Sequence, residues 1–487
     1  MNLSEYAKYD ATGLAELVSK NQISPKELAD LAVKAIELVN PELNAVVEVY
    51  SDRAKQPYLD KLPKGRLHGV PILKKDLAFS EAGQLSEMGS LLTKGFIADI
   101  TSTAIERLLD AGAVVLGRTT TPEFGLTGTT ESKLSGITRN PWDIQRTPGG
   151  SSGGSAGMVA AGVVPIATAS DGGGSTRGPA AYCGLIGLKQ SRGRIPAGPG
   201  RSEGNNGLSA SFVLTRSARD CALCLDIMNG PAQGDPYSIT KPERPYREEI
   251  MRPLKKMHIA YTNSSWIKSP LGKDSKKAVH TALRKLEAEG HTVEEATPDY
   301  DIEAFIMATT VVACANLARD TDVIAARLGR KVDEATLQST TLECYRYGKQ
   351  ISATQLLDAL GVFNTVNRSV GHFFARYDLF VTPTNLQPAP VIDKYYRSEP
   401  SEPFTAESWQ SQVFENDSFL ATFNTTGQPA ISLPLDETNE GIPVGVQFAS
   451  QFGDEATLIR LAAFFEEALP WGMRKPQIHV SKRIPVK

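Results

Sequence analysis

The sequence predicts an α/β fold in which a central mixed β-sheet is covered by helices on both faces. Short apolar segments alternate with helical ones from residue 68 onward, and strand-like segments return near the C-terminal end. The chain has 487 residues, of which 41% are hydrophobic and 22% charged, so it can build a large core. No internal repeat is evident. We therefore expect one large domain, residues 1–487.

The first 55 residues are predicted to form helices. Ser24 has the residue type of an N-cap, Pro25 suits the first helical position, and Glu27 can complete a capping box. The apolar residues that follow, up to Val39, recur on one helical face. This pattern indicates an outer helix that packs on the sheet.

The central and C-terminal segments are expected in the following order. The first strand, GVPILKKDL, begins at Gly69, and Gly112 ends the helix after it. The remaining strands are predicted at 113–117, 257–261, 379–383, 424–435 and 445–450, and the helices at 102–111, 217–228, 275–289, 302–330, 355–376 and 455–469. A proline-rich loop is expected at 388–403.

Composition and charge argue against several classes of function. Net charge is −3 and the basic residues are scattered, so we expect no nucleic-acid partner. The longest apolar run, residues 156–169, is too short to span a bilayer, and the N-terminus does not resemble a signal peptide. The five cysteines fit a reducing compartment. Cys221 and Cys224 lack a second ligand pair, so no metal is expected there. No organic cofactor is expected either, and the cytoplasm is the expected location.

The stretch 149–196 is the richest candidate for a functional site. It places Ser151 and Ser175 in glycine-rich turns, 24 residues apart. Glycines allow the backbone to turn with positive φ and to aim successive N–H groups at one point. Such a turn can form an anion-binding nest or an oxyanion hole.

Two alternative sites use the same glycines. The segments 149–153 and 150–154 both fit G-x-S-x-G, but a nucleophile elbow must follow a buried strand, and the preceding residues are loop-like. A Ser-His-Asp enzyme also needs a histidine, and neither His372 nor His479 has a recognisable context. The glycine-rich motifs that bind phosphate groups, G-x-x-x-x-G-K-[ST] and G-x-G-x-x-G, do not occur in the sequence.

A serine nucleophile without histidine needs another base, and two lysines could supply it. Lys74 and Lys75 end an apolar strand, where strand alternation turns one of them inward. A desolvated lysine favours its neutral form and can accept a proton near neutral pH. The alternative, two solvated charges at a strand end, is the better expectation for an arbitrary lysine pair.

Three motifs in this order resemble the amidase signature family over essentially the whole chain. They are GVPILKKD, GGSSGGSAG and SDGGGSTRGPAAYCGLIGLK, with EFG before the second and NTTGQPAISLP and PVGVQ after the third. The resemblance implies the amidase signature fold. It also implies Ser175 as nucleophile, Ser151 after a cis peptide bond as bridging serine, and Lys75 as base.

Further roles follow from the same resemblance. The backbone N–H groups of Gly172, Gly173, Gly174 and Ser175 would form the oxyanion hole. Ser152, Asp171 and Arg177 would support the catalytic residues, and Gly125, Leu126, Thr127 and Cys314 would contact the substrate. For Cys314 an ordinary buried thiol is an equally good interpretation. Residues 60–220 would form the catalytic core, about 230–405 a helical insertion beside the substrate, and 420–470 the return to the sheet.

The resemblance predicts hydrolysis of a small carboxamide through an acyl-enzyme. Three segments, ALPWGMRKPQ, TRSARDCALCLDIMNG and VVACANLARD, are similar to the 6-aminohexanoate cyclic dimer hydrolases, which act on nylon oligomers. The alternative is the A subunit of a tRNA-dependent amidotransferase. It is disfavoured because that subunit normally has a GSS-type signature after an EFA segment, whereas this chain has EFGLTGTTES. A catalytically inactive scaffold is disfavoured because Lys75, Ser151 and Ser175 are all present. The sequence leaves the oligomeric state open and allows a homodimer.

Overall fold

A computed structural model describes residues 1–483 apart from 268, 394–398 and 401. Its centre is an 11-stranded mixed sheet in the order β1-β3-β2-β6-β8-β7-β12-β13-β11-β9-β10. The strands of this sheet are β1 (Val46–Val49), β2 (Pro71–Lys75), β3 (Val114–Thr119), β6 (Ile166–Asp171), β7 (Ile186–Lys189), β8 (Ala210–Thr215), β9 (His258–Tyr261), β10 (Thr292–Glu295), β11 (Leu379–Pro383), β12 (Ala430–Glu437) and β13 (Pro443–Ser450). A small hairpin, β4 (Glu131–Ser132) with β5 (Gly136–Ile137), lies apart from it.

The strands that matter most for the site are parallel neighbours. β2 pairs in parallel with β3 on one side and with β6 on the other, with Leu73 opposite Ala167. Beyond β6 the order continues through antiparallel pairs as far as β11, and β9 and β10 complete the edge in parallel. β2 and β6 are adjacent and parallel, so their carboxyl ends lie side by side at the same end of the strands.

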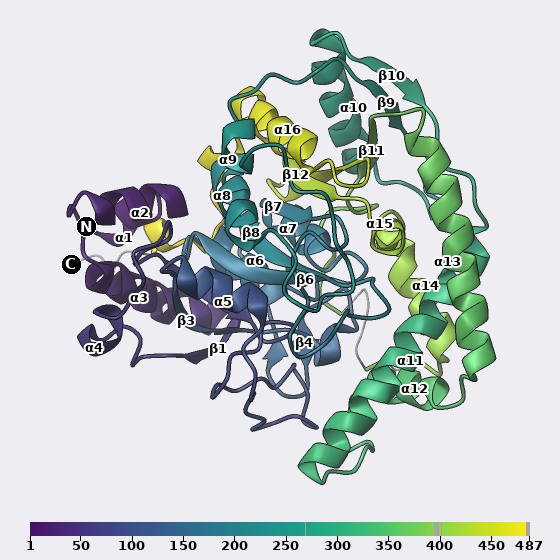
Figure 1. Cartoon of the computed structure of the whole chain (residues 1–487), viewed down its shortest axis with the longest axis horizontal. Coiled ribbons are helices and arrows are strands. Elements are labelled where there is room, and N and C mark those ends of the chain that lie inside the picture. Colours follow the sequence, from purple (N-terminus) through teal and green to yellow (C-terminus); the bar gives the residue numbers. More distant parts are fainter. Residues whose placement is uncertain (268, 394–398, 401, 484–487) are drawn as a thin grey trace.

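Helices surround the sheet (Figure 1). The α-helices are α1 (Leu3–Tyr6), α2 (Ala11–Ser19), α3 (Pro25–Leu43), α4 (Gln56–Leu59), α5 (Thr103–Asp110), α6 (Gly153–Ala160), α7 (Arg177–Cys183), α8 (Ala218–Met228), α9 (Tyr246–Glu249), α10 (Lys273–Ala288), α11 (Ile302–Leu328), α12 (Ser339–Gly348), α13 (Ala353–Phe374), α14 (Ala406–Asp417), α15 (Ala421–Thr426) and α16 (Glu455–Ala468). Single 3₁₀ turns are η1 (Glu123–Gly125), η2 (Trp471–Met473) and η3 (Val480–Lys482).

The helix beginnings follow from local chemistry. Ser24 caps α3 and forms the predicted capping box with Glu27, while Pro25 occupies the first turn. The side chain of Ser217 likewise caps α8. These predicted helices are confirmed, with ends that differ from the prediction by a few residues.

Several helices cover the sheet, and two groups of them also contact one another. α6 and α7 contact each other and the central strands, whereas α8, α9 and α16 form a second contiguous group over β7, β8, β12 and β13. Both groups bury apolar side chains in one large core that runs from Leu3 to Val480. The α/β fold with a helix-covered mixed sheet is therefore confirmed.

The region 230–405 contributes strands as well as helices. β9, β10 and β11 come from it and extend the main sheet, while α11, α12 and α13 form a layer at one side of the molecule (Figure 1). The sequence predicts β9 and β11 but not β10, whose residues are mostly exposed. Part of the predicted loop 388–403 lies outside the described residues.

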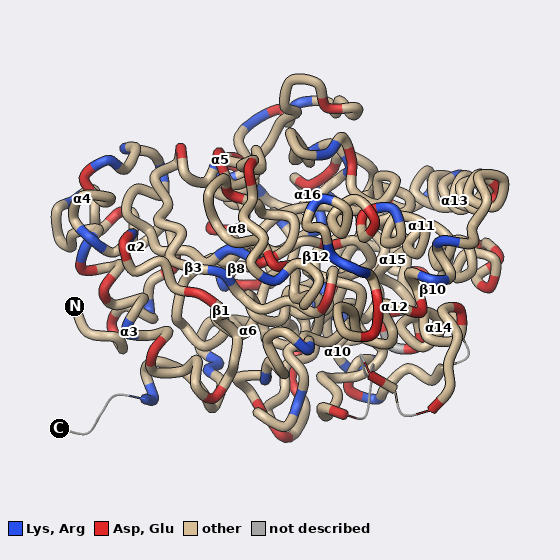
Figure 2. Tube along the Cα trace, turned by 90° about the horizontal axis from the view of Figure 1, so that it is seen from below, with Lys and Arg blue, Asp and Glu red and all other residues tan. Residues whose placement is uncertain are grey.

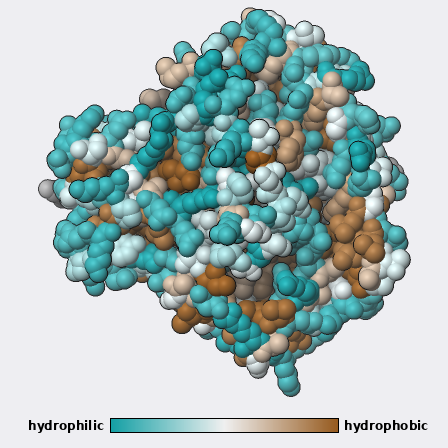
Figure 3. Space-filling view, in the orientation of Figure 1, coloured by the Kyte–Doolittle hydropathy of each residue, from teal (hydrophilic) through white to brown (hydrophobic). Residues whose placement is uncertain are grey.

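The surface has no dominant charge. Blue and red segments alternate along the trace in Figure 2, and Figure 3 shows hydrophobic residues in separate groups among hydrophilic ones on that face. Among the described helices, α11 alone is long and apolar enough to cross a membrane by length and composition, and 39% of its most apolar window is buried. It packs against α12, α13 and α14.

Candidate active site

The site lies at the adjacent carboxyl ends of β2 and β6. Lys75 is the last residue of β2, and Asp171 is the last residue of β6. The backbone N–H of Lys75 donates to Thr168 Oγ1 on β6 over 2.8 Å, which fixes the two strand ends relative to each other. Ligands of open α/β sheets commonly bind outside such carboxyl ends.

Lys75 points into a cluster of serine hydroxyls. Its Nζ lies 2.7 Å from Ser151 Oγ, 3.0 Å from Ser152 Oγ and 2.9 Å from Ser170 Oγ. The side chain is completely buried, and this burial lowers its pKa from 10.5 to about 7. Ser152 directs its own hydrogen to Ser170 O, so a neutral Lys75 can still accept a proton from Ser151 or Ser170.

Lys74 points to the opposite face of β2, as strand alternation requires. Its Nζ is 3.6 Å from Glu81 Oε2, and Arg53 pairs with the same carboxylate at 2.6 Å. Burial lowers the pKa of Lys74 to about 8. Both lysines are almost wholly inaccessible, so the alternative of two solvated charges is wrong.

The glycine turn before α6 presents Ser151. The peptide bond between Gly150 and Ser151 is cis, and a Cβ on Gly150 would lie 2.4 Å from Thr129 O. Thr130 Oγ1 donates to Gly149 O, and Thr121 Oγ1 donates to Ser151 O. Only glycine fits against this backbone at position 150. The hydrogen bonds from the two threonine hydroxyls stabilise the turn.

The loop after β6 is held by one buried ion pair. Arg177 binds the carboxylate of Asp171 through Nε and Nη2, both at 2.9 Å. Burial would raise the pKa of Asp171, but the charge and hydrogen bonds of Arg177 hold it well below its usual range. The expected pairing of these two residues is present, and Asn424 adds a hydrogen bond to the carboxylate.

The same carboxylate corrects one expectation about the loop. The N–H of Gly174 donates to Asp171 Oδ1 at 2.7 Å and is therefore already occupied. Gly172, Gly173 and Ser175 line the cavity, and the structure assigns their N–H groups no acceptor among the described residues. Three of the four predicted oxyanion donors remain available.

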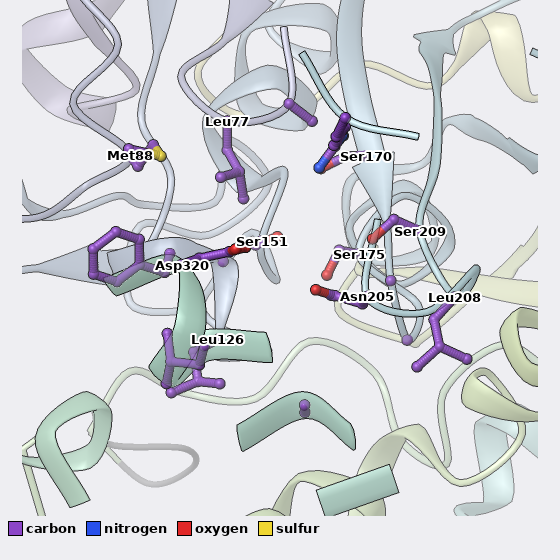
Figure 4. Close-up of a pocket in the computed structure, with 18 of the residues that line it drawn as sticks. Leu77, Met88, Leu126, Ser151, Ser170, Ser175, Asn205, Leu208, Ser209 and Asp320 are labelled. Atoms are coloured by element: carbon purple, nitrogen blue, oxygen red, sulfur yellow. The ribbon is translucent and has the colours of Figure 1, made fainter. Parts of the chain in front are cut away.

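A cavity of about 540 Å³ opens beside these groups. Figure 4 shows Ser151, Ser170 and Ser175 around the same space, with Leu77, Met88 and Leu126 as apolar neighbours. Of the predicted substrate residues, Gly125, Leu126 and Thr127 line it. Cys314 does not, because it is fully buried in a cluster with Phe124 and Leu126, behind the wall.

Sequence reasoning missed several cavity residues. Ser170 Oγ lies 2.9 Å from Lys75 Nζ, and the one signal in the sequence was that Ser170 directly precedes Asp171, a predicted site residue. Asn205, Ser209 and Asp417 also line the cavity. They lie on loops and at a helix end whose distance from Ser175 in sequence gives no indication of contact.

The amidase family profile matches residues 27–459 of the chain. The chain belongs to the amidase family. It is 33% identical to the 6-aminohexanoate-cyclic-dimer hydrolase of Paenarthrobacter ureafaciens over 98% of both chains. It is 30% identical to the A subunit of the glutamyl-tRNA(Gln) amidotransferase of Shouchella clausii over 96% of this chain and 99% of that one.

Among solved structures, a 6-aminohexanoate cyclic dimer hydrolase complexed with substrate superimposes with a TM-score of 0.92. It shares 32% identity and covers 97% of this chain and 99% of its own. Together with the family match, these similarities identify the protein as an amidase that hydrolyses carboxamide C–N bonds other than peptide bonds. The amidotransferase is a more distant relative.

Proposed function

We propose that this amidase uses Ser175 as nucleophile, Ser151 as proton relay and Lys75 as base. Neutral Lys75 takes a proton from Ser151. Ser151 in turn takes the proton of Ser175, as Ser175 Oγ attacks the amide carbonyl. Ser151 then passes a proton to the leaving nitrogen, the C–N bond breaks, and an acyl-enzyme remains. Water hydrolyses this ester by the reverse proton path.

The negative oxygen of the tetrahedral intermediate needs preorganised donors. We assign this role to the N–H groups of Gly172, Gly173 and Ser175, because Gly174 already donates to Asp171. Such donors are typically worth several kcal/mol, roughly 3 for a single one. Asp171 and Arg177 keep the loop in shape, while Ser152 and Ser170 orient the amine of Lys75.

The observation that carries this proposal is the 2.7 Å contact between Lys75 Nζ and Ser151 Oγ in the wall of the cavity that Ser175 also lines. A buried lysine with a pKa of about 7 is matched to proton transfer at neutral pH. His372 and His479 do not line this cavity, so a histidine base has no support here.

For the substrate we propose cyclic or linear amides of the 6-aminohexanoate type. The similarity over the full length of the cyclic dimer hydrolases supports this class, and the cavity also offers apolar side chains, such as Leu77, Met88 and Leu126, that a methylene chain can contact. The alternative, an A subunit of a glutamine-dependent tRNA amidotransferase, rests on the lower similarity to that relative. A cytoplasmic location, the oligomeric state and independence from nucleic acid and membrane stay predictions.

The test is amine release from a panel of aryl acylamides, aliphatic amides, glutamine and the 6-aminohexanoate cyclic dimer. We expect the purified chain alone to hydrolyse the cyclic dimer, and Ser175→Ala to lose activity by a factor on the order of 10³ or more. Ser86→Ala, at another serine that lines the cavity, is the control and should stay active. Activity that survives in Ser175→Ala would overturn the mechanism, and hydrolysis of glutamine alone would favour the amidotransferase alternative.

A further inference from the structure

One face of α14 lines the cavity and ends in a carboxylate. Gln410, Val413, Phe414 and Asp417 contribute to the lining, and their spacing of three, four and seven residues places them on one side of the helix. Asp417 is the last residue of α14. A carboxylate at this end of a helix adds to the negative partial charge of the terminal carbonyl groups, which favours a cation nearby.

The segment that carries Asp417 packs directly on the nucleophile loop. The backbone N–H of Leu420 donates to Asp417 O at 3.0 Å, and a Cβ on Gly174 would lie 2.4 Å from Leu420 Cδ1. Arg177 Nη1 also donates to Leu420 O at 2.9 Å. Asp417 is therefore three residues before Leu420, which contacts the loop that presents Ser175.

Asp417 has no ion-pair partner among the described residues. Its Oδ1 accepts a hydrogen bond of 2.6 Å from Asn385 Nδ2, and its Oδ2 receives none from the described residues. Burial raises its pKa to about 7, although the nearby charge of Arg177 opposes the rise.

Arg177 cannot complete the pair because its donors are already occupied. All five N–H groups of its guanidinium are directed elsewhere, to Asp171, Asn424, Gln447 and Leu420 O. Among the described residues no lysine, arginine or histidine nitrogen lies within 4 Å of the Asp417 carboxylate, so a bound ligand can supply that cation.

The other carboxylates of the cavity differ in this respect. Asp99 pairs with Arg327 at 3.2 Å and Asp320 with Arg319 at 2.6 Å. Among the described residues that line the cavity, Asp417 is thus the one carboxylate without an ion-pair partner within 4 Å. Burying an ionised carboxylate without an opposite charge costs free energy, and a bound cationic ligand would offset that cost.

We propose that Asp417 binds an ammonium group of the substrate, so that the preferred amides carry an amino group at the far end of the acyl chain or expose one on ring opening. This inference rests on the proposed function. When a cyclic diamide opens, the C–N bond breaks and the nitrogen, still tethered to the acyl group, has received the proton of Ser175. With one further proton from solvent it becomes an ammonium, which Asp417 holds away from the ester carbonyl.

The test measures binding rather than turnover, in a Ser175→Ala background. The two ligands are 6-aminohexanamide and heptanamide, which differ by an ammonium in place of a terminal methyl group, and calorimetry gives their Kd values. We expect Ser175→Ala with Asp417 intact to bind 6-aminohexanamide at least about tenfold more tightly than the double variant that also carries Asp417→Asn. Heptanamide should bind the two proteins within about twofold of each other.

Two further variants keep the result interpretable. Asp417→Glu retains the charge and should retain the preference for 6-aminohexanamide, whereas Asp320→Asn, at another carboxylate that lines the cavity, should leave both Kd values within about twofold. Equal binding of both ligands by Ser175→Ala with Asp417 intact would overturn the proposal without any variant at 417. An equal loss of both ligands in Asp417→Asn would also overturn it. Amide turnover by the wild type tests the proposed function separately.

Discussion

At the scale of the residue, the burial of Lys75 both supports its proposed role as base and costs free energy when its amine is charged. The side chain is wholly inaccessible and its three hydroxyl contacts carry no formal charge. Burial without a counter-ion disfavours the ammonium form, which explains the pKa of about 7. Asp171 raises that pKa only in part, because its charge is already paired with Arg177.

The first prediction concerns the pH dependence of hydrolysis. Lys75 can accept a proton only in its neutral form, so kcat/KM for an uncharged amide should rise with pH and level off above about 7. Below that pH it should fall by about tenfold per unit. A profile measured from pH 5 to 9 checks this. A flat profile across pH 5 to 8 would contradict the assignment of Lys75 as base.

The second prediction concerns stability. The pKa of Lys75 is about 7 in the folded chain and 10.5 as its ordinary value, so between these pH values the unfolded chain binds one more proton. The free energy of unfolding should therefore gain a contribution that rises with pH in this window, by up to about 1.4 kcal/mol per unit. Lys75→Met removes that contribution.

Chemical denaturation of wild type and Lys75→Met at pH 7 to 10 measures the effect. The stability of the variant relative to the wild type should decrease as pH rises, because only the wild type gains this contribution. Lys34→Met, at an exposed lysine on α3, is the matched control and should give a difference that does not change with pH. A difference for Lys75→Met that is likewise constant would show that the amine is charged in the folded protein.

At the scale of the element, the loop between β6 and α7 depends on one glycine more than on its neighbours. Gly174 has φ of +128°, and a Cβ there would lie 2.4 Å from Leu420 Cδ1. Gly173 has no atom within 4 Å of the corresponding position. The two adjacent glycines thus differ in what a methyl group would meet.

We predict that Gly174→Ala lowers the free energy of unfolding by roughly 1–3 kcal/mol, because it adds both backbone strain and a clash. It should also lower kcat, since the displaced loop carries Ser175. Gly173→Ala should leave stability within about 0.5 kcal/mol of the wild type. Thermal and denaturant unfolding of the two variants, compared side by side, check the difference, and equal stability of the two would contradict it.

The elements differ in how far the sequence predicts them. Helix α3 is marked by its own residues, since Ser24, Pro25 and Glu27 satisfy its first backbone groups locally. Strand β10 is not, because its exposed residues lack the alternation of a half-buried strand and its partner among the described strands, β9, is distant in sequence. The proposed role of Asp417 could not be predicted from the sequence either, because it depends on contacts with residues distant in sequence. Its environment depends on Asn385 and Arg177, which reach it only through the tertiary fold.

At the scale of the whole molecule, the region 230–405 is joined to the rest by a shared sheet and a shared core. β11 pairs antiparallel with β13, so the region extends the sheet directly from the C-terminal strands. Ile259, Val279 and Leu286 belong to the same hydrophobic cluster as Leu73 and Ile166. The resemblance to the family predicts the helices of this region as an insertion, but it does not reveal that its strands complete the sheet.

This continuity predicts that the region 230–405 unfolds together with the rest of the chain. Trp266 belongs to the region and packs on Phe380 of β11, whereas Trp142, Trp409 and Trp471 lie outside it. In a variant that retains Trp266 as its sole tryptophan, fluorescence in urea should give the same midpoint as far-UV circular dichroism, which reports on all helices and strands. The physical reason is that loss of β9 and β11 exposes one side of β13 and the buried residues beneath α10, so neither part keeps a complete core.

The matched variant retains only Trp142, which packs near Tyr182 and donates its indole N–H to Cys183 O, in the part that contains the proposed catalytic residues. Both single-tryptophan proteins should unfold at one midpoint within the error of the measurement, and amide hydrolysis should be lost at the same urea concentration. If Trp266 instead reported an earlier transition while Trp142 and the circular dichroism of the remainder persisted, the region would be a separate folding unit. In that case the strands β9 to β11 would add to the sheet without stabilising it, and the cavity wall formed by α11 could open while the catalytic core stayed folded.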